Sequence, residues 1–164
     1  MKYIACLLLL FGLWACGGST YDQLELYSPP SSKAPMFFRS ADSLKMAKKL
    51  EAIRHGFAPE SLAETHEFIK DLKLLGIKKE QIPSTKFGEI NKVLFKPFGK
   101  IPSTESINDY PSYYTILVFK KEGEIVGVMK ICPGCYEHYA VGIENQIRYF
   151  GLSEDYEKLN ELLR

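Results

Sequence analysis

The chain has 164 residues, and its 21 Lys and Arg nearly balance its 20 Asp and Glu, which leaves a formal net charge of +1 at neutral pH. No basic stretch is dense enough to neutralise a row of phosphates, so the composition argues against nucleic acid as a partner. The length suffices for one hydrophobic core.

A short apolar segment opens the chain behind one positive charge. Lys2 precedes Tyr3–Ala15, a run that carries no charged residue. A membrane-spanning helix needs about 20 apolar residues, whereas the apolar part of a secretory signal is shorter and follows a positively charged start. We therefore expect residues 1–15 to be a signal peptide that is absent from the mature protein.

The apolar run ends in Leu13-Trp14-Ala15-Cys16. This stretch resembles the lipobox of bacterial lipoproteins, in which Leu, a small or aliphatic residue, and Ala or Gly precede the Cys; Trp14 is bulkier than the residue usual at that position. The resemblance implies that Cys16 is acylated and becomes the first residue of the mature protein. The alternative is ordinary cleavage near Ala15 or Gly17, which would release a soluble secreted protein.

Acylation would attach the protein to a membrane of the cell envelope through its N-terminal lipid. Two or more acyl chains hold a protein on a bilayer far more firmly than one. In well-studied lipoproteins of Gram-negative bacteria, an Asp after the lipidated Cys retains the protein in the inner membrane. Gly17 occupies that position here, so the resemblance implies the outer membrane and leaves the leaflet open.

The segment that follows Cys16 is rich in Gly, Ser and Pro. Residues 17–35 read GGSTYDQLELYSPPSSKAP, a composition typical of flexible linkers. We therefore expect residues 16–35 to be a lipidated tether and residues 36–164 to be one domain. A short strand around Leu24–Leu26 is the alternative for the middle of the tether.

Two helices are predicted at the start of the domain. Ser40 is a suitable N-cap for the first, whose apolar residues keep helical spacing until Gly56 ends it. Pro59 begins the second, which Gly76 ends. The very short connection predicts a helical hairpin.

The rest of the domain shows mainly strand patterns. Residues 90–95 predict a strand, and three prolines within residues 97–112 predict a long loop. Residues 113–120 and 125–132 predict two antiparallel strands joined by a turn at 121–124. A third strand is predicted at 136–141, and a last helix at 154–163. This order, which lacks βαβ alternation, indicates an α+β fold: an N-terminal helical hairpin packed on a small antiparallel β-meander with a C-terminal helix.

The Cys132-Pro-Gly-Cys135 stretch is the one most suggestive of chemistry. A redox dithiol places such a pair at a helix start, but the residues after Cys135 suit a strand. A zinc knuckle would need further ligands, of which His138 is the nearest. A disulfide staple fits an exported protein and a type II turn, in which Pro133 fixes φ and Gly134 accepts a positive φ. We favour the staple and expect no cofactor, with zinc as an alternative.

Tyrosines gather around the predicted sheet and the Cys turn. Tyrosine is large and amphipathic, which suits a binding surface, although half-buried strand positions are the simpler explanation. The candidates for the binding surface are Tyr110, Tyr113, Tyr114, Tyr136 and Tyr139.

Sequence motifs of enzymes do not stand out. No GxSxG, HExxH or phosphate-loop pattern occurs in the chain. The sequence therefore favours a membrane-anchored, non-enzymatic binding or accessory protein with a protein partner in the envelope. The alternative is a thiol-based redox or zinc-binding envelope protein that uses Cys132 and Cys135.

Overall fold

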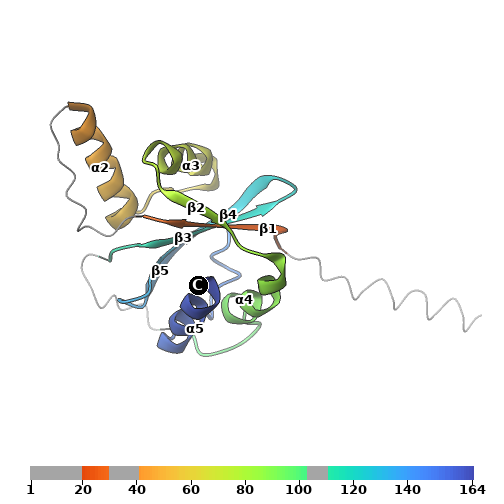
Figure 1. The fold of residues 1–164 in the computed structure, drawn as a ribbon. Coiled ribbons are helices and arrows are strands. Elements are labelled where there is room, and N and C mark those ends of the chain that lie inside the picture. Colours follow the sequence, from red (N-terminus) through yellow and green to blue (C-terminus); the bar gives the residue numbers. More distant parts are fainter. Residues whose placement is uncertain (1–19, 30–40, 103–110) are drawn as a thin grey trace, which may run out of the picture.

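The fold is built around one antiparallel sheet with helices on both of its faces (Figure 1). The computed structural model describes residues 20–29, 41–102 and 111–164. The five strands of the sheet follow the order β2-β1-β3-β4-β5. Their bounds are β1 Gln23–Ser28, β2 Lys78–Gln81, β3 Thr115–Lys121, β4 Glu124–Cys132 and β5 Glu137–Val141.

In the described part of the chain, four helices cover the sheet. One face carries α2 (Ala41–His55) and α3 (Thr65–Leu74), and the other carries α4 (Phe87–Leu94) and α5 (Ser153–Leu163) (Figure 1). The predicted α+β class, the antiparallel sheet and the C-terminal helix are therefore confirmed.

Strand alternation divides the core into two halves. Along β3, Leu117 and Phe119 face α4 and α5, whereas Ile116 and Val118 face α2 and α3. Successive side chains of a strand point to opposite faces of a sheet, so this central strand supplies both halves. All four side chains are fully buried, and burial of each stabilises the fold by roughly 1.5–3 kcal/mol.

The turn between β3 and β4 agrees with its prediction. Glu122 and Gly123 connect the strands with φ values of +54° and +87°. Positive φ at both central residues is the mark of a type I′ turn, whose twist matches that of the flanking strands.

Strand β1 lies inside the sheet, where the sequence predicts a tether. It pairs with β2 on one side and with β3 on the other. Leu24 and Leu26 enter the α4 and α5 half of the core, and Tyr27 enters the other half. The expected tether over residues 16–35 is therefore wrong for Gln23–Ser28, and the domain begins before residue 36.

β1 contains a buried carboxylate, Glu25, which interrupts the apolar pattern of the strand. Glu25 accepts hydrogen bonds from Lys120 at 2.8 Å, Lys79 at 3.2 Å and the hydroxyl of Tyr27 at 3.0 Å. Burial acts to raise the pKa of Glu25, but these hydrogen bonds hold it below its ordinary value. Lysines on both neighbouring strands thus neutralise the charge that β1 brings into the sheet.

Residues 90–95 form most of helix α4 and its end, so the predicted strand is wrong. Ile90, Val93 and Leu94 are buried at helical spacing on the α5 side of the sheet. A short apolar run does not distinguish a strand from a buried helix, and packing against α5 decides the matter. Lys96 then forms an ion pair with Asp155 in the first turn of α5.

The connection between α2 and α3 is longer than predicted. α3 begins at Thr65 after a 3₁₀ turn, not at Pro59, so residues 56–64 separate the two helices. Both helices contribute to the same half of the core, and Lys49 forms an ion pair with Asp71 across them. The predicted very short hairpin turn is therefore not confirmed.

Candidate functional site

The Cys132–Cys135 hairpin joins β4 to β5 at one end of the sheet. Its loop is residues 133–136, and the amide of Cys135 donates a hydrogen bond to the carbonyl of Cys132 at 3.3 Å. The two Cα atoms lie 5.4 Å apart and the sulfurs are joined as a disulfide. This separation is usual for disulfides, so the geometry corresponds to the staple.

The loop places its left-handed backbone at Tyr136. Tyr136 has φ +53°, and Gly134 is not among the described residues with positive φ. A type II turn needs a positive φ at Gly134, so the predicted type II turn is wrong. Tyr136 is held in this unusual conformation by its ring contact with Tyr156, at 5.8 Å between centroids, and by a hydrogen bond to Glu157 at 3.4 Å.

Cys132 and His138 point to opposite faces of the sheet. Cys132 pairs with Glu137, whereas His138 pairs with Ile131. Since side chains alternate along a strand, His138 shares the α4 and α5 face with Ile131, and Cys132 lies on the other face. His138 is therefore not a third zinc ligand beside the cysteines. Among the described residues, no group of three or more His, Cys, Asp or Glu is arranged to hold a metal ion.

His138 packs inside the α4 and α5 half of the core. Its Nδ1 lies 2.8 Å from the hydroxyl of Tyr156, and its ring meets Phe150 at 5.1 Å between centroids. Burial lowers the pKa of His138 to about 4. The ring is therefore neutral at neutral pH, and Nδ1 accepts a hydrogen bond from the hydroxyl of Tyr156.

We expect acid to destabilise the fold through His138. Its pKa is about 4 in the folded protein and about 6.5 in an unfolded chain, so the unfolded state binds the extra proton between these values. Stability is fully present above pH 6.5 and falls as the pH drops toward 4, by roughly 3 kcal/mol from this group. Denaturant unfolding at pH 7 and pH 4.5 measures the loss.

Two variants isolate this effect from the titration of carboxylates. His138→Gln keeps an acceptor for Tyr156 and cannot titrate, so it should lose less stability in acid than the unmodified protein. His66→Gln, at an exposed position, should leave the acid dependence unchanged. An equal acid loss in both variants would contradict the role of His138.

A buried lysine that no sequence motif marks lies on β4, two residues before Cys132. The side chain of Lys130 has no exposed surface, and its Nζ donates to the carbonyls of Gly56 at 2.5 Å and Ala58 at 3.2 Å. The ring centroids of Tyr113 and Tyr139 lie 4.7 and 5.9 Å from Nζ. Burial lowers the pKa of Lys130 to about 7, while the carbonyls and ring faces favour the ammonium form.

Lys130, with the rings of Tyr113 and Tyr139, forms a lysine cluster that fixes the segment between α2 and α3 on the sheet. Tyr139 adds a third bond, from its hydroxyl to the carbonyl of Pro59 at 3.0 Å. Phe57 packs on Tyr139 at 5.5 Å between ring centroids and remains 62% exposed. The cluster thus holds an exposed aromatic ring in one position.

The predicted binding tyrosines differ in how far they are exposed. Tyr113 is 2% exposed, so its assignment to a binding surface is wrong. The hydroxyl of Tyr114 accepts a hydrogen bond from Arg54 at 2.7 Å, and the guanidinium lies 4.9 Å from the ring centroid. Tyr136 is 40% exposed. Tyr110 lies outside the described residues.

A serine, a histidine and a glutamate lie close together near the end of α2. His55 Nδ1 lies 3.2 Å from Ser112 Oγ, and Nε2 lies 3.6 Å from Glu51 Oε1. The same Nδ1 is 3.1 Å from the carbonyl oxygen of Pro111. A carbonyl only accepts, so Nδ1 carries the proton and has no lone pair for Ser112. The arrangement fixes the segment before β3 to α2 and does not activate the serine.

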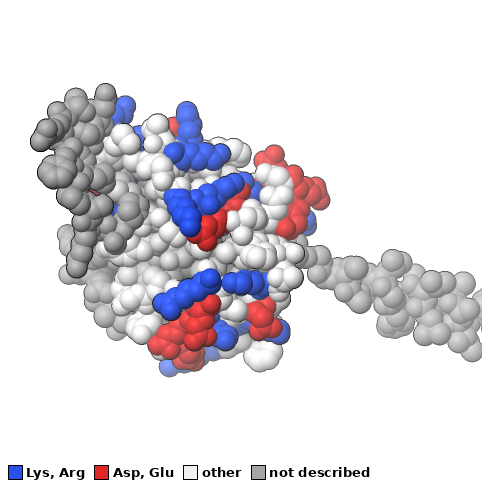
Figure 2. All heavy atoms as spheres, viewed as in Figure 1, with Lys and Arg blue, Asp and Glu red and all other residues white. Residues whose placement is uncertain are grey.

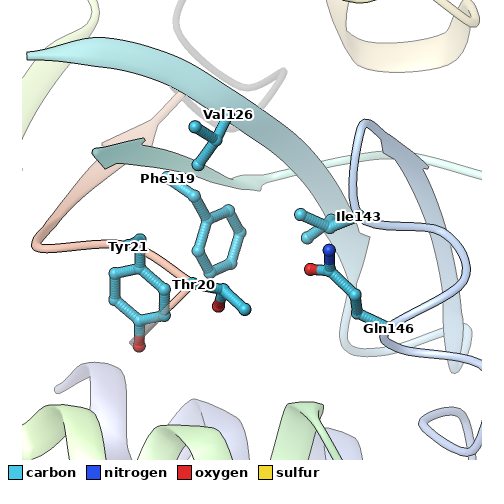
Figure 3. Close-up of a pocket in the computed structure, with 6 residues that line it drawn as sticks. All are labelled: Thr20, Tyr21, Phe119, Val126, Ile143 and Gln146. Atoms are coloured by element: carbon cyan, nitrogen blue, oxygen red, sulfur yellow. The ribbon is translucent and has the colours of Figure 1, made fainter. Parts of the chain in front are cut away.

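A small cavity lies at the opposite end of the sheet, where β1 begins (Figure 3). Figure 3 shows the rings of Tyr21 and Phe119 side by side, and their centroids are 5.1 Å apart. The cavity measures about 30 Å³, room for about one or two water molecules. Its lining consists of Thr20, Tyr21, Phe119, Val126, Ile143 and Gln146.

The face of the protein shown in Figure 2 carries mixed charge. Basic and acidic side chains are interspersed over it, and acidic side chains gather at the right, where Figure 1 places the β3–β4 turn. Helix surfaces contribute ion pairs such as Lys92 with Glu89 at 2.6 Å and Lys158 with Glu161 at 3.2 Å. This pattern is that of a solvated surface.

Within the described residues, no helix has the length and apolar character needed to cross a bilayer.

The features that the sequence did not mark, Lys130 and the exposed Phe57, have no motif and depend on contacts between distant segments. No family model, no curated protein and no solved structure matches this chain.

Proposed function

We propose that this chain is a lipid-anchored protein of the cell envelope with a non-enzymatic binding or accessory role. The observation that carries the proposal is Leu13-Trp14-Ala15-Cys16 directly after an apolar signal segment. Lipid on Cys16 would hold the protein on a membrane, and Gly17 favours the outer membrane. The partner would be another protein of the envelope.

The start of the fold supports a short attachment to that membrane. Tyr21 is 1% exposed and packs against Phe87 at 4.9 Å between ring centroids. Only residues 17–20 separate it from Cys16. A chain spans at most about 3.5 Å per residue, so Tyr21 lies within roughly 17 Å of the lipidated cysteine. The domain would therefore stay close to the bilayer.

Strand directions support a surface that faces away from the membrane. The start of β1 pairs with the end of β3, and β4 returns from Glu124 near that point to Cys132. The nine residues of β4 extend about 27 Å at 3.4 Å per step. The Cys132–Cys135 hairpin thus lies at the end of the sheet remote from Tyr21 (Figure 1), within reach of a partner above the bilayer.

Metabolic labelling with a palmitate analogue tests the anchor. The unmodified protein should incorporate label and fractionate with membranes, and Cys16→Ala should lose both properties. Cys6→Ala, inside the expected signal peptide, is the matched control and should behave like the unmodified protein. A soluble, unlabelled mature protein that begins near residue 16 would exclude lipid anchoring.

A thiol-based role is the second candidate, and one observation favours it. Cys132 is 6% exposed, whereas Cys135 is half-buried in the hairpin loop. An external thiolate therefore reaches the sulfur of Cys135 more readily than that of Cys132, and access is one of the factors that sets the rate of thiol–disulfide exchange.

Replacement of both cysteines separates the two candidates. Under the binding role, Cys132→Ser with Cys135→Ser should keep the fold and the function, and the free energy of unfolding should fall by about 2 kcal/mol at most, because the closed loop is very short. Denaturant unfolding and a binding assay measure the two quantities. Loss of function in either single variant, with the fold intact, would favour the thiol role.

A further inference from the structure

The outer edge of β5 presents backbone groups that point away from the sheet. The carbonyl of Ile131 accepts a hydrogen bond from the segment that leads into β3. Backbone direction alternates along an antiparallel strand, so Lys130 faces β5, and its pair Tyr139 faces β4. His138 and Ala140 therefore direct their peptide groups outward, where no strand of the described sheet pairs with them.

An apolar ridge, formed by Phe57, Tyr139 and Leu62, follows the same strand. Phe57 and Leu62 are 62% and 43% exposed. Phe57 packs on Tyr139 in the middle of β5, and Leu62 packs against Gly142 directly after the strand ends. Bonds from Lys130 and Tyr139 hold the segment that carries Phe57. The ridge is thus preformed, which reduces the entropy lost when a partner binds.

Three carboxylates surround this β5 ridge. Glu60 and Glu64 stand on either side of Leu62 in the chain, and the carboxylate of Glu144 accepts a hydrogen bond from the amide of Gly142 at 2.9 Å. After burial, which is the largest cause, all three act to raise the pKa of Tyr139. None of them takes part in an ion pair with another described residue. The charge of Lys130 lies buried beneath the ring and is directed to backbone carbonyls. The rim of the ridge is therefore negative.

We propose that the β5 ridge and the outward edge of β5 bind an extended, basic segment of a partner protein, which adds as a strand beside β5. Strand addition supplies backbone hydrogen bonds, and alternate side chains of the added segment reach the ridge. Basic side chains on that segment meet the three carboxylates. The inference rests on the proposed binding role, but it does not depend on lipid anchoring.

The same charges argue against a second copy of this chain as the occupant. Antiparallel pairing of two β5 edges would be a two-fold contact, in which the same surface patch meets itself. Glu60, Glu64 and Glu144 of both copies would then approach one another, and like charges at an interface suppress association.

Selection from a random-peptide display library tests the proposal. The target is the mature chain, residues 16–164, with Cys16→Ser so that no lipid is attached. Enriched peptides should be basic with alternating apolar residues, and their binding should weaken as salt rises. On binding, amide hydrogen exchange should slow at His138 and Ala140. No enrichment, enrichment of peptides without basic residues, dimerisation through β5, or protection at other amides would overturn the proposal.

Variants of the ridge and of its rim sharpen the test. Phe57→Ser should weaken binding of an enriched peptide by about tenfold or more, and the combined change of Glu60, Glu64 and Glu144 to Gln should have a similar effect. Leu74→Ser is the control for an exposed apolar side chain, since Leu74 is 63% exposed at the end of α3. Glu122→Gln is the control for charge.

The result is independent of the labelling experiment. Binding that resists both the Phe57 and the carboxylate changes would overturn this inference alone, since it would leave palmitate labelling at Cys16 untouched. Failure of labelling, with selection of basic peptides intact, would overturn the anchor alone.

Discussion

A chain that begins at residue 36 should fail to fold. Such a chain lacks β1, which pairs with both β2 and β3. It also lacks the buried side chains Leu24, Leu26 and Tyr27, each worth about 2 kcal/mol. This loss rivals the total stability of a typical domain, about 5–15 kcal/mol. Far-UV circular dichroism and denaturant unfolding should show no cooperative transition.

A chain that begins at residue 18 is the matched control. It removes the signal segment and Cys16 but keeps Tyr21 and β1, so it should unfold cooperatively. If the chain from residue 36 unfolded cooperatively at the same denaturant concentration, β1 would not be part of the stable sheet.

Replacement of Lys130 by glutamate should cost roughly 4 kcal/mol or more. The new carboxylate would face the carbonyl oxygens of Gly56 and Ala58 and the faces of two tyrosine rings, all of which repel negative charge. An uncompensated buried charge costs about 3–5 kcal/mol. Lys130→Met, which leaves two carbonyls without a donor but buries no charge, should cost far less. Denaturant unfolding at pH 7 compares the variants.

The unmodified protein should also become more stable as the pH rises from about 7 to 9.5. The folded pKa of Lys130 is about 7 and that of an unfolded lysine about 10.4, so the unfolded chain binds the extra proton in this window. The penalty of burying the ammonium group is fully present below pH 7 and declines steadily as the pH rises from 7 toward about 10.4. Lys130→Met should abolish the rise, and a rise that persists in this variant would assign it to another group.

Parts of the fold with strong local signals could be predicted from the sequence. The β3–β4 hairpin has two apolar runs and a Glu-Gly turn, and helix α5 has one apolar face. In both cases, neighbours in sequence are also neighbours in space, so local patterns carry the information.

Other elements could not be predicted because distant contacts decide them. β1 carries a Glu that is tolerated only beside Lys79 and Lys120. β2, with the sequence KKEQ, has no apolar pattern and exists through its pairing with β1. The α4 segment has the composition of a strand, and its contact with α5 makes it a helix.

The candidate site shows the same division. The Cys132 and Cys135 pair was visible as a motif, but the separation of His138 from it follows from strand pairing. The tyrosine cluster was visible too, yet its members divide into the buried Tyr113 and the exposed Tyr136. Whether a side chain is covered depends on segments far away along the chain, which composition does not report.

The sequence by itself determined the features that act through adjacent residues: the lipobox-like leader that motivates the proposed anchor, the α+β class, the hairpin turn and the spacing of the cysteines. Only the tertiary structure decided where the domain begins, and it decided that Lys130 lies beneath two aromatic rings and holds Phe57 exposed. The physical reason is that burial and hydrogen bonding between residues more than 70 positions apart arise from packing, which no local pattern encodes.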